Sequence, residues 1–375
     1  MPTERVITQK PDEDIIVKAP SGYQQTGKVT TDAAKTRTRI PAPTPTTAPP
    51  PPPPVDPPPP TSKTNILGVD FHARPQTGEP WKRLDAARKG ATNISMDSVN
   101  GNSGKNGALL ALAFYAAATD DAASKAKVVD ICKAAMSPGA PRGRTLEQAR
   151  NLAPIAISLD AIGDHTLDGM LKTERDRVMP SQGSVVNCHT KRPNNWGTVS
   201  GLARIAVSAH ISDTADVALA VKVFRGWLGD RDAYKGFTYG SLDWQANPTA
   251  PVGINPLGSF KGTVFVDGIL PDDQRRQSEH GDKPQFPEYA CENYVWQAMG
   301  EVFATALILR ALGWTDVFTW SDAALQRAYA SLHAHGCEMT GDDSWQYANA
   351  QMLGVTIPHE GFAPGKSMGW TDWLY

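Results

Sequence analysis

The sequence predicts an all-α protein built from antiparallel helical hairpins and preceded by a disordered N-terminal segment. Alanine-rich stretches with apolar residues at helical spacing recur between about residues 106 and 353, and short polar turns separate them. Strand patterns are confined to short pieces such as 262–266. Because consecutive hairpins bury their apolar faces against one another, we expect a solenoid or a closed ring of hairpins.

Residues 1–62 have the composition of a disordered segment. Aliphatic residues are sparse, and 40–61 is dominated by proline, which favours extended polyproline II geometry. The first residues lack the apolar core of a Sec signal peptide. We expect this segment to tether a single helical domain at 63–375 to a larger assembly, in an extracellular or virion-associated setting. A free disordered tail is the alternative.

Helices are expected at nine places in the remaining sequence. Their ranges are about 106–117, 126–135, 145–162, 167–178, 195–209, 213–227, 293–312, 321–334 and 344–353. The stretch between about 231 and 287 breaks the pattern, because it is rich in glycine, proline, aspartate and aromatic residues. A loop of that length inside a compact domain is usually functional rather than connective.

Composition argues against several classes of partner. A net charge of −2 does not suit a nucleic-acid-binding protein, and no apolar run is long enough to span a bilayer. His333 and His335 form an H-x-H pair, but no carboxylate or third histidine lies nearby in sequence, so we interpret them as favourable residues at a helix C-terminus. His280 is a weaker candidate in the long loop. We therefore expect no metal, no cofactor, no nucleic acid and no membrane insertion.

The four cysteines are widely spaced and form no CxxC pair, so a zinc site made from them is not expected. Cys132 shares a helical face with valines and is interpreted as a core residue. Cys188 and Cys291 each lie beside one of two polar motifs. We expect both to be buried free thiols, with a disulfide between them as the alternative.

The first polar motif lies just ahead of the helical pattern at 195–209. A proline and an asparagine immediately before a helix are start signals, so the motif is expected on a loop at a helix N-terminus. Backbone N–H groups and the helix dipole favour anions there. A plain turn with a helix cap is the alternative. The residues that carry the chemistry are His189, Lys191, Arg192, Asn194, Asn195 and Trp196.

The second polar motif, Glu292-Asn293-Tyr294, begins the helical pattern at 293–312, and an Asp-Gly-x-Leu-Pro segment precedes it at 267–271. With these motifs the chain resembles the helical-toroid polysaccharide lyases of the alginate lyase type, over roughly residues 100–355. The Asn-Asn-His motif of that family is matched by Asn194-Asn195. Its Asp-Gly-x-Leu-Pro-x-Glu-x-x-Arg segment is matched by Gly268 to Arg276, and its His-Asn-Tyr by Asn293-Tyr294.

Three positions depart from the family pattern. Trp196 stands where the family has a histidine, which makes His189 the nearest substitute. Glu292 stands where the family has its second histidine. The family's arginine seven residues before the tyrosine is a proline here, so Arg275 or Arg276 would take that role.

The resemblance implies an incomplete (α/α) toroid that cleaves an acidic polysaccharide by β-elimination. Removing the weakly acidic C5 proton of a uronate requires that the neighbouring carboxylate be neutralised or hydrogen-bonded, a task for amides and cations. A tyrosine or histidine then moves the proton. The implied catalytic residues are Asn195, Tyr294, His189 and Arg275. The implied substrate-binding residues are Asn194, Arg192, Lys191, Trp196, Tyr239, Trp244, Asn293 and Arg276, with the aromatic rings stacking on sugars.

Two other functions stay open from the sequence. A glycoside hydrolase on a similar helical ring would use paired carboxylates, for which Asp273 and Glu292 are the candidates. A non-catalytic head on a proline-rich stalk would bind glycan without cleaving it. The products separate the two enzyme classes, because only a lyase leaves a C4–C5 double bond that absorbs ultraviolet light.

Overall fold

The computed structural model describes residues 65–97, 103–179, 183–275, 291, 293–339, 341–358 and 362–375. The side chains of Ser103, Arg275, Asn293 and Asp342 are outside this description. So are residues 1–64, which contain the whole predicted disordered segment, and Arg276, His280 and Glu292.

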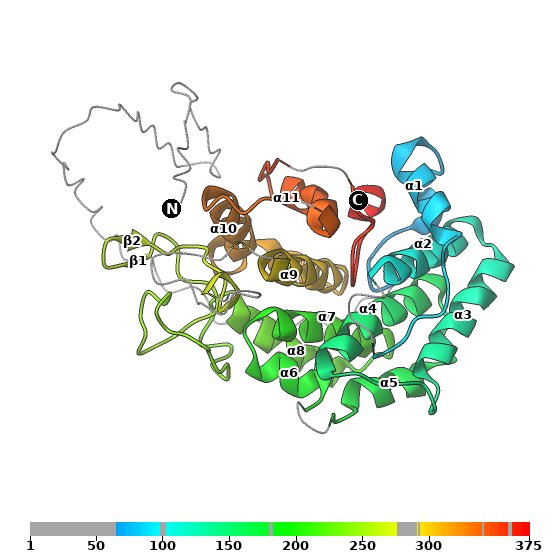
Figure 1. Ribbon diagram of the computed structural model, residues 1–375, viewed down its shortest axis with the longest axis horizontal. Coiled ribbons are helices and arrows are strands. Elements are labelled where there is room, and N and C mark those ends of the chain that lie inside the picture. The colour runs from blue at the N-terminus through cyan, green and yellow to red at the C-terminus, as the bar shows by residue number, and fades with distance from the viewer. Residues whose placement is uncertain are drawn as a thin grey trace, which may run out of the picture. The chain divides into compact units, whose positions relative to one another are not determined.

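The described residues form an all-α fold, as predicted (Figure 1). Their one sheet is a hairpin of two strands with two residues each, which lies in the long loop and pairs Phe260 with Phe265. The helices are α1 (Gly78–Arg88), α2 (Ser103–Thr119), α3 (Ala122–Met136), α4 (Thr145–Ile162), α5 (Asp168–Asp176), α6 (Val185–Lys191), α7 (Asn195–His210), α8 (Thr214–Trp227), α9 (Asn293–Ala311), α10 (Trp320–Ala334), α11 (Tyr347–Met352) and α12 (Thr371–Leu374). Short 3-10 helices are η1 (Phe71–Ala73), η3 (Asp273–Arg275), η4 (Val317–Thr319) and η5 (Gly341–Gln346), and the strands are β1 (Phe260–Lys261) and β2 (Val264–Phe265).

Four helices pack in a row, α2 on α4, α4 on α7 and α7 on α9. Contacts near their first turns show that they run parallel. Asn106 of α2 donates to Asn151 of α4 at 2.9 Å, and Asn195 of α7 donates to Gln297 of α9 at 2.9 Å. Arg144, the N-cap of α4, lies 5.5 Å from the ring of Trp196 in the first turn of α7, so all four helices begin at the same end of the row. Figure 1 shows α3, α5, α6 and α8 on its outer side.

The row forms the core because α4, α7 and α9 are buried on almost every side. Alanine and glycine in these helices let their backbones approach closely. Each helix also buries several polar side chains, which are expensive to remove from water and therefore need partners or a specific role.

The C-terminal segment 362–375 lies between the two ends of this row. Trp370 donates its indole N–H to the carbonyl of Gly107 in α2 at 2.9 Å. The ring of Tyr375 lies 5.2 Å from the guanidinium of Arg310 in α9, and Lys366 pairs with Asp343 of η5 at 3.1 Å. The segment thus contacts both the first and the last helix of the row.

Two of the three described helices that the sequence pattern did not predict, α1 and α6, are held by specific contacts rather than by an apolar stripe. In α1 only Leu84 is fully buried, and the helix is attached to α2 by Trp81 stacked on Tyr115 and by Arg88 over the same ring at 3.6 Å. The seven-residue α6 starts at a Ser184 cap, whose hydroxyl accepts from the N–H of Asn187. His189 therefore lies on a helix and not on a loop.

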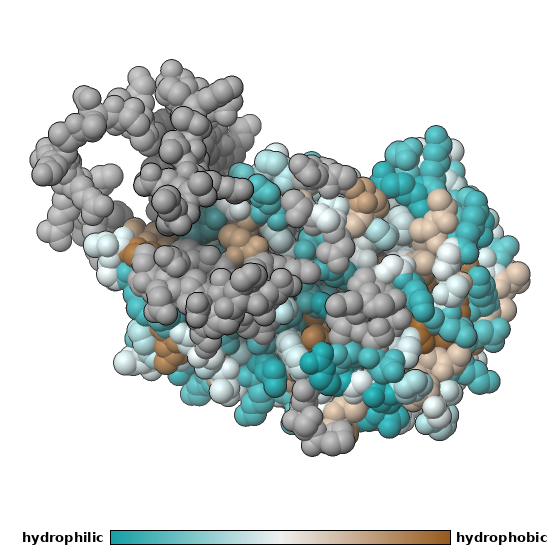
Figure 2. Space-filling view, viewed as in Figure 1, coloured by the Kyte–Doolittle hydropathy of each residue, from teal (hydrophilic) through white to brown (hydrophobic). Residues whose placement is uncertain are grey.

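On the face seen in Figure 2, hydrophobic residues form small separate patches among hydrophilic ones. Within the described residues, no helix is both long enough and apolar enough to cross a membrane.

Candidate active site

The first polar motif is the start of α7, as its proline and asparagines predict. Asn194 is the N-cap, and its side chain accepts from the backbone N–H of Trp196 at 3.2 Å. Gly197 is required by the close approach of the preceding turn, because a Cβ atom there would lie 1.7 Å from the carbonyl oxygen of Arg192. The motif therefore has a fixed conformation at the common end of the row.

Trp196 lies between two arginines. The guanidinium of Arg192 sits 4.6 Å from the centre of its ring and that of Arg144, the N-cap of α4, sits 5.5 Å away. Arg144 is already neutralised by Glu147, which raises the pKa of the Arg144 guanidinium. Among the described residues, neither Lys191 nor Arg192 has an acidic partner, so both cations are available to an anion.

Asn195 is fully buried, and its amide links α7 to α9 through the 2.9 Å bond to Gln297. In this position it cannot touch a ligand in solvent, so we assign it a positioning role in place of the predicted direct contact with a sugar carboxylate. Tyr294 is half-buried and lies three residues before Gln297, on the same side of α9. The Asn195–Gln297 bond consequently brings Tyr294 next to the start of α7.

His189 does not suit its predicted role in proton transfer. It is 6 % exposed, and its ring packs against α7 at Gly201, where a Cβ atom would lie 2.9 Å from Nε2. Burial lowers the pKa of His189 to about 3, so the imidazole is uncharged at ordinary pH. It lines a cavity of about 10 Å³ with Thr198 and Thr305, which is room for roughly one water molecule.

The two aromatic residues of the long loop that were predicted to stack on sugars differ in exposure. Trp244 has no exposed surface, lies in a small cluster with Val266 and Ile269, and donates its N–H to the carbonyl of Ser241. It therefore cannot stack on a sugar, and that prediction is wrong. Tyr239 is half-buried, with its pKa raised by burial.

Tyr239 is also close to the motif along the chain. The preceding residue, Thr238, donates its backbone N–H to the carbonyl of Lys191 at 2.8 Å. Tyr234 adds a second anchor, because its hydroxyl donates to the carbonyl of Thr190. The long loop is thus attached to the end of α6, and the Tyr239 ring packs edge-on against Phe237 and Trp244, one residue after that attachment.

A buried polar cluster lies deeper along α9, and sequence reasoning missed it. Glu301, one turn after Gln297, is 4 % exposed, and burial raises the pKa of its carboxyl to about 7. The Ser367 hydroxyl and the cations Arg150 and Lys366 act against that rise. The available signal was the polar spacing of Gln297, Glu301 and Thr305 within an otherwise apolar helix.

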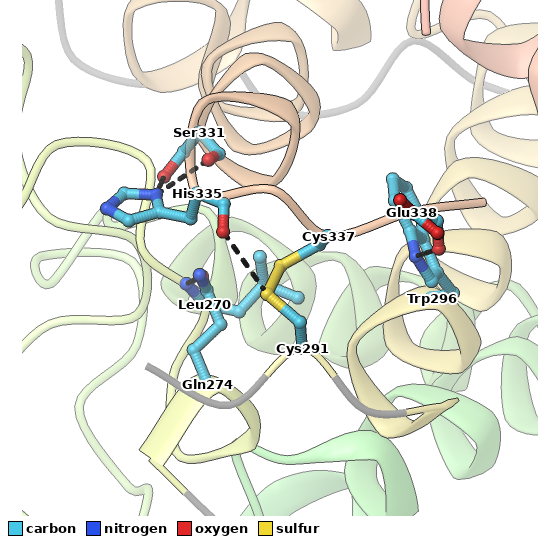
Figure 3. The surroundings of a disulfide bond; sticks show 8 residues. All are labelled: Leu270, Gln274, Cys291, Trp296, Ser331, His335, Cys337 and Glu338. Atoms are coloured by element: carbon cyan, nitrogen blue, oxygen red, sulfur yellow. Dashed lines mark hydrogen bonds between the residues drawn. A yellow bond between two sulfur atoms is a disulfide. The ribbon is translucent and has the colours of Figure 1, made fainter. Parts of the chain in front are cut away.

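A disulfide joins Cys291 to Cys337, 46 residues apart (Figure 3). It ties the residue just ahead of α9 to the chain just after α10, next to the bond from the Trp296 indole to the carbonyl of Glu338. The predicted free thiol at Cys291 is wrong, because the antiparallel pairing of α9 with α10 brings two distant cysteines together. Cys188 is a buried free thiol, as predicted, and burial raises its pKa.

The other predicted site residues cannot be placed by their side chains. Arg275 and Asn293 have described backbones only, and Arg276 and Glu292 lie outside the described residues. Asp273, the other half of the hydrolase pair, is 1 % exposed. Within the described part of the chain, Lys191, Arg192, Asn194 and Trp196 lie together around the start of α7. The bond from Asn195 to Gln297 brings the first turns of α9, which carry Tyr294, to the same end, and the bond from Thr238 to Lys191 attaches the loop that carries Tyr239.

Comparison with known proteins adds no family to this geometry. No protein-family model matches the chain, and no curated protein matches it. The likeness to the alginate lyase type therefore rests on the three motifs, two of which are the starts of neighbouring parallel helices in this structure.

Proposed function

We propose that the chain is a polysaccharide lyase that cleaves a uronic-acid-containing glycan by β-elimination, on an incomplete (α/α) toroid. The parallel row α2, α4, α7 and α9, with outer helices between its members, is the inner ring in this proposal. The C-terminal segment, which contacts α2 and α9, would close the ring.

One observation carries the proposal. The 2.9 Å bond between Asn195 and Gln297 holds the starts of α7 and α9 together, so the turn that bears Tyr294 lies beside the turn that bears Asn194. This neighbourhood of the two helix starts supports a role for the Tyr294 phenol in proton transfer beside the amide and cationic groups of the first motif. β-Elimination from a uronate needs this combination.

The reaction assigns each group a task. Arg192, Lys191 and Asn194 hold the sugar carboxylate and stabilise the charge that develops on it when the C5–H bond breaks. Tyr294 takes the C5 proton and delivers it to the glycosidic oxygen as the C4–O bond breaks. The products are a new reducing end and a C4–C5 double bond, so atoms balance without water.

Preference for an acidic glycan follows from the charges at this end of the row. The N-termini of α4 and α7 carry positive partial charge, and two cations without acidic partners among the described residues lie beside them. Trp196, held between Arg144 and Arg192, and Tyr239 offer half-buried rings that suit the apolar faces of sugars.

A location in an oxidising compartment would suit this chain, because it carries a disulfide. The Cys291–Cys337 disulfide persists outside the reducing cytosol. With the proline-rich segment predicted as a tether, this supports a depolymerase displayed outside the cell or on a virion.

The test is a screen of the purified chain against uronate-containing polysaccharides, with ultraviolet absorbance as readout. We expect absorbance to rise with at least one substrate. The rate of that rise should be at least a hundredfold lower for Tyr294→Phe. Tyr115→Phe, which removes a phenol hydroxyl from α2, is the matched control and should keep full activity. New reducing ends without absorbance would indicate a hydrolase, and binding without cleavage would indicate a glycan-binding head.

A further inference from the structure

Two histidines and an aspartate meet at the far end of α4 and α7. His210 is the last residue of α7, Asp168 is the first residue of α5, and His165 lies in the loop between α4 and α5. Their ligand-type atoms all lie within 4.8 Å of one another. Since α7 has 16 residues, the cluster is roughly 22 Å along the helix from the proposed active site.

His210 is held in one orientation by a carboxylate behind it. Its Nδ1 bonds the Oδ1 atom of Asp160 at 3.0 Å, and the other oxygen of Asp160 accepts from the backbone N–H of Ile66 at 2.6 Å. When Nδ1–H donates to this carboxylate, Nε2 carries the lone pair that can bind a metal ion. A carboxylate in this position is the usual outer support of a metal-binding histidine.

The Nε2 atom of His210 faces Asp168 without forming a hydrogen bond. It lies 3.0 Å from Oδ1, yet the two atoms are not aligned for a hydrogen bond, and neither has another hydrogen-bond partner among the described residues. The other oxygen of Asp168 lies 3.2 Å from Nδ1 of His165. A metal ion bound along the lone-pair direction of His210 Nε2 would account for this geometry, because Asp168 Oδ1 would then bind the ion from the side and would not accept a hydrogen bond from the nitrogen.

Distances and exposure also fit an ion. Ligand atoms on a tetrahedral ion with bonds of about 2.1 Å lie about 3.4 Å apart, within a few tenths of an ångström of the two contacts to Asp168. The rings of His165 and His210 are stacked 9° from parallel, so one must turn for both to point at one ion. The His165 side chain is 58 % exposed and can turn freely, whereas that of His210 is fully buried.

We propose that His165, Asp168 and His210 bind a divalent transition-metal ion, best matched by zinc, with Asp160 as the supporting carboxylate. Two imidazoles and one carboxylate favour zinc over magnesium or calcium, which prefer oxygen ligands only. The site joins the ends of α4, α5 and α7, so the bound ion stabilises the fold away from the active site. It does not depend on the lyase proposal.

Motif spacing along the chain does not indicate this site, because its members come from a loop, a helix start and a helix end. The H-x-H pair at 333 and 335 was the more visible candidate. In the structure His335 instead bonds the carbonyl of Ser331 at 2.7 Å.

The test uses the full chain, stripped with a chelator and titrated with zinc chloride by calorimetry, with thermal unfolding followed in parallel. We expect one zinc per chain, a higher unfolding temperature with zinc and no change with magnesium. His165→Ala and Asp168→Asn should each weaken zinc binding at least tenfold, and Asp160→Asn ten- to a hundredfold. Both ligand variants change partly exposed side chains, so they should fold.

His333→Ala is the matched control, since it removes an exposed histidine from the competing pair. It should bind zinc as the unmodified chain does. Absence of saturable zinc binding, or unchanged affinity in His165→Ala and Asp168→Asn, would overturn the proposal. Loss of binding in His333→Ala would also overturn it, because it would place the ion on the other pair.

Discussion

Glu301→Gln is expected to stabilise the protein at alkaline pH and to leave its stability unchanged at acid pH. Burial raises the pKa of the Glu301 carboxyl from its ordinary 4.5 to about 7 in the folded protein. Between these values the folded state holds a proton that the unfolded state has released, so stability falls as pH rises through this window. Glutamine resembles the protonated carboxyl in shape and removes the titration.

The magnitude follows from the two pKa values. A change from 4.5 to about 7, at about 1.4 kcal/mol per pKa unit, corresponds to roughly 3 kcal/mol. Glu301→Gln should therefore unfold at about the same denaturant concentration as the unmodified chain at pH 4. At pH 8 it should be roughly 3 kcal/mol more stable.

The assay is urea unfolding followed by circular dichroism at pH 4, 6 and 8, with the disulfide intact throughout. Glu338→Gln, which changes an exposed glutamate after α10, is the matched control and should show no such pH dependence. An equal effect of Glu301→Gln at all three pH values would refute the reasoning, because it would mean that Glu301 is not a buried, protonated carboxyl.

Three further outcomes are expected. Gly197→Ala should destabilise the protein by at least about 2 kcal/mol, because its Cβ atom would lie 1.7 Å from a carbonyl oxygen; Gly104→Ala, with nothing within 4 Å, should be neutral or stabilising in the same unfolding assay. Reducing the Cys291–Cys337 disulfide should lower stability by about 4 kcal/mol for its 46-residue separation, and an unchanged midpoint in reductant would contradict the pairing. Since the pKa of His189 is lowered to about 3, stability should fall by up to roughly 5 kcal/mol as pH drops from 6.5 to 3, and His189→Leu should show a visibly shallower decline.

The helices could be predicted well where apolar spacing is regular. The expected range 145–162 coincides with α4, and 213–227 differs from α8 by one residue. Helix α1 was beyond such reasoning, because one leucine and two aromatic contacts hold it in place of an apolar stripe. Likewise, the seven-residue α6 is too short to show a period.

The candidate site could be predicted as a set of motifs but not as a geometry. The start of α7 was legible from Pro193 and Asn194, since each has a local cause. The burial of Asn195 was not, because an amide at a helix start normally faces water and here faces Gln297. The prediction that Trp244 stacks on sugars was wrong for the same reason, because nothing in the neighbouring sequence distinguishes a buried indole from an exposed one.

The most direct test of the central claim is mass spectrometry of glycan fragments released in ¹⁸O-labelled water. β-Elimination forms a C4–C5 double bond and takes no oxygen from the solvent, so the account predicts unlabelled, unsaturated fragments during the reaction. Their release should be lost in Tyr294→Phe and kept in Tyr115→Phe. Saturated fragments that carry one ¹⁸O atom at the cleaved bond would contradict the account, because they would show that water, and not elimination, breaks the chain.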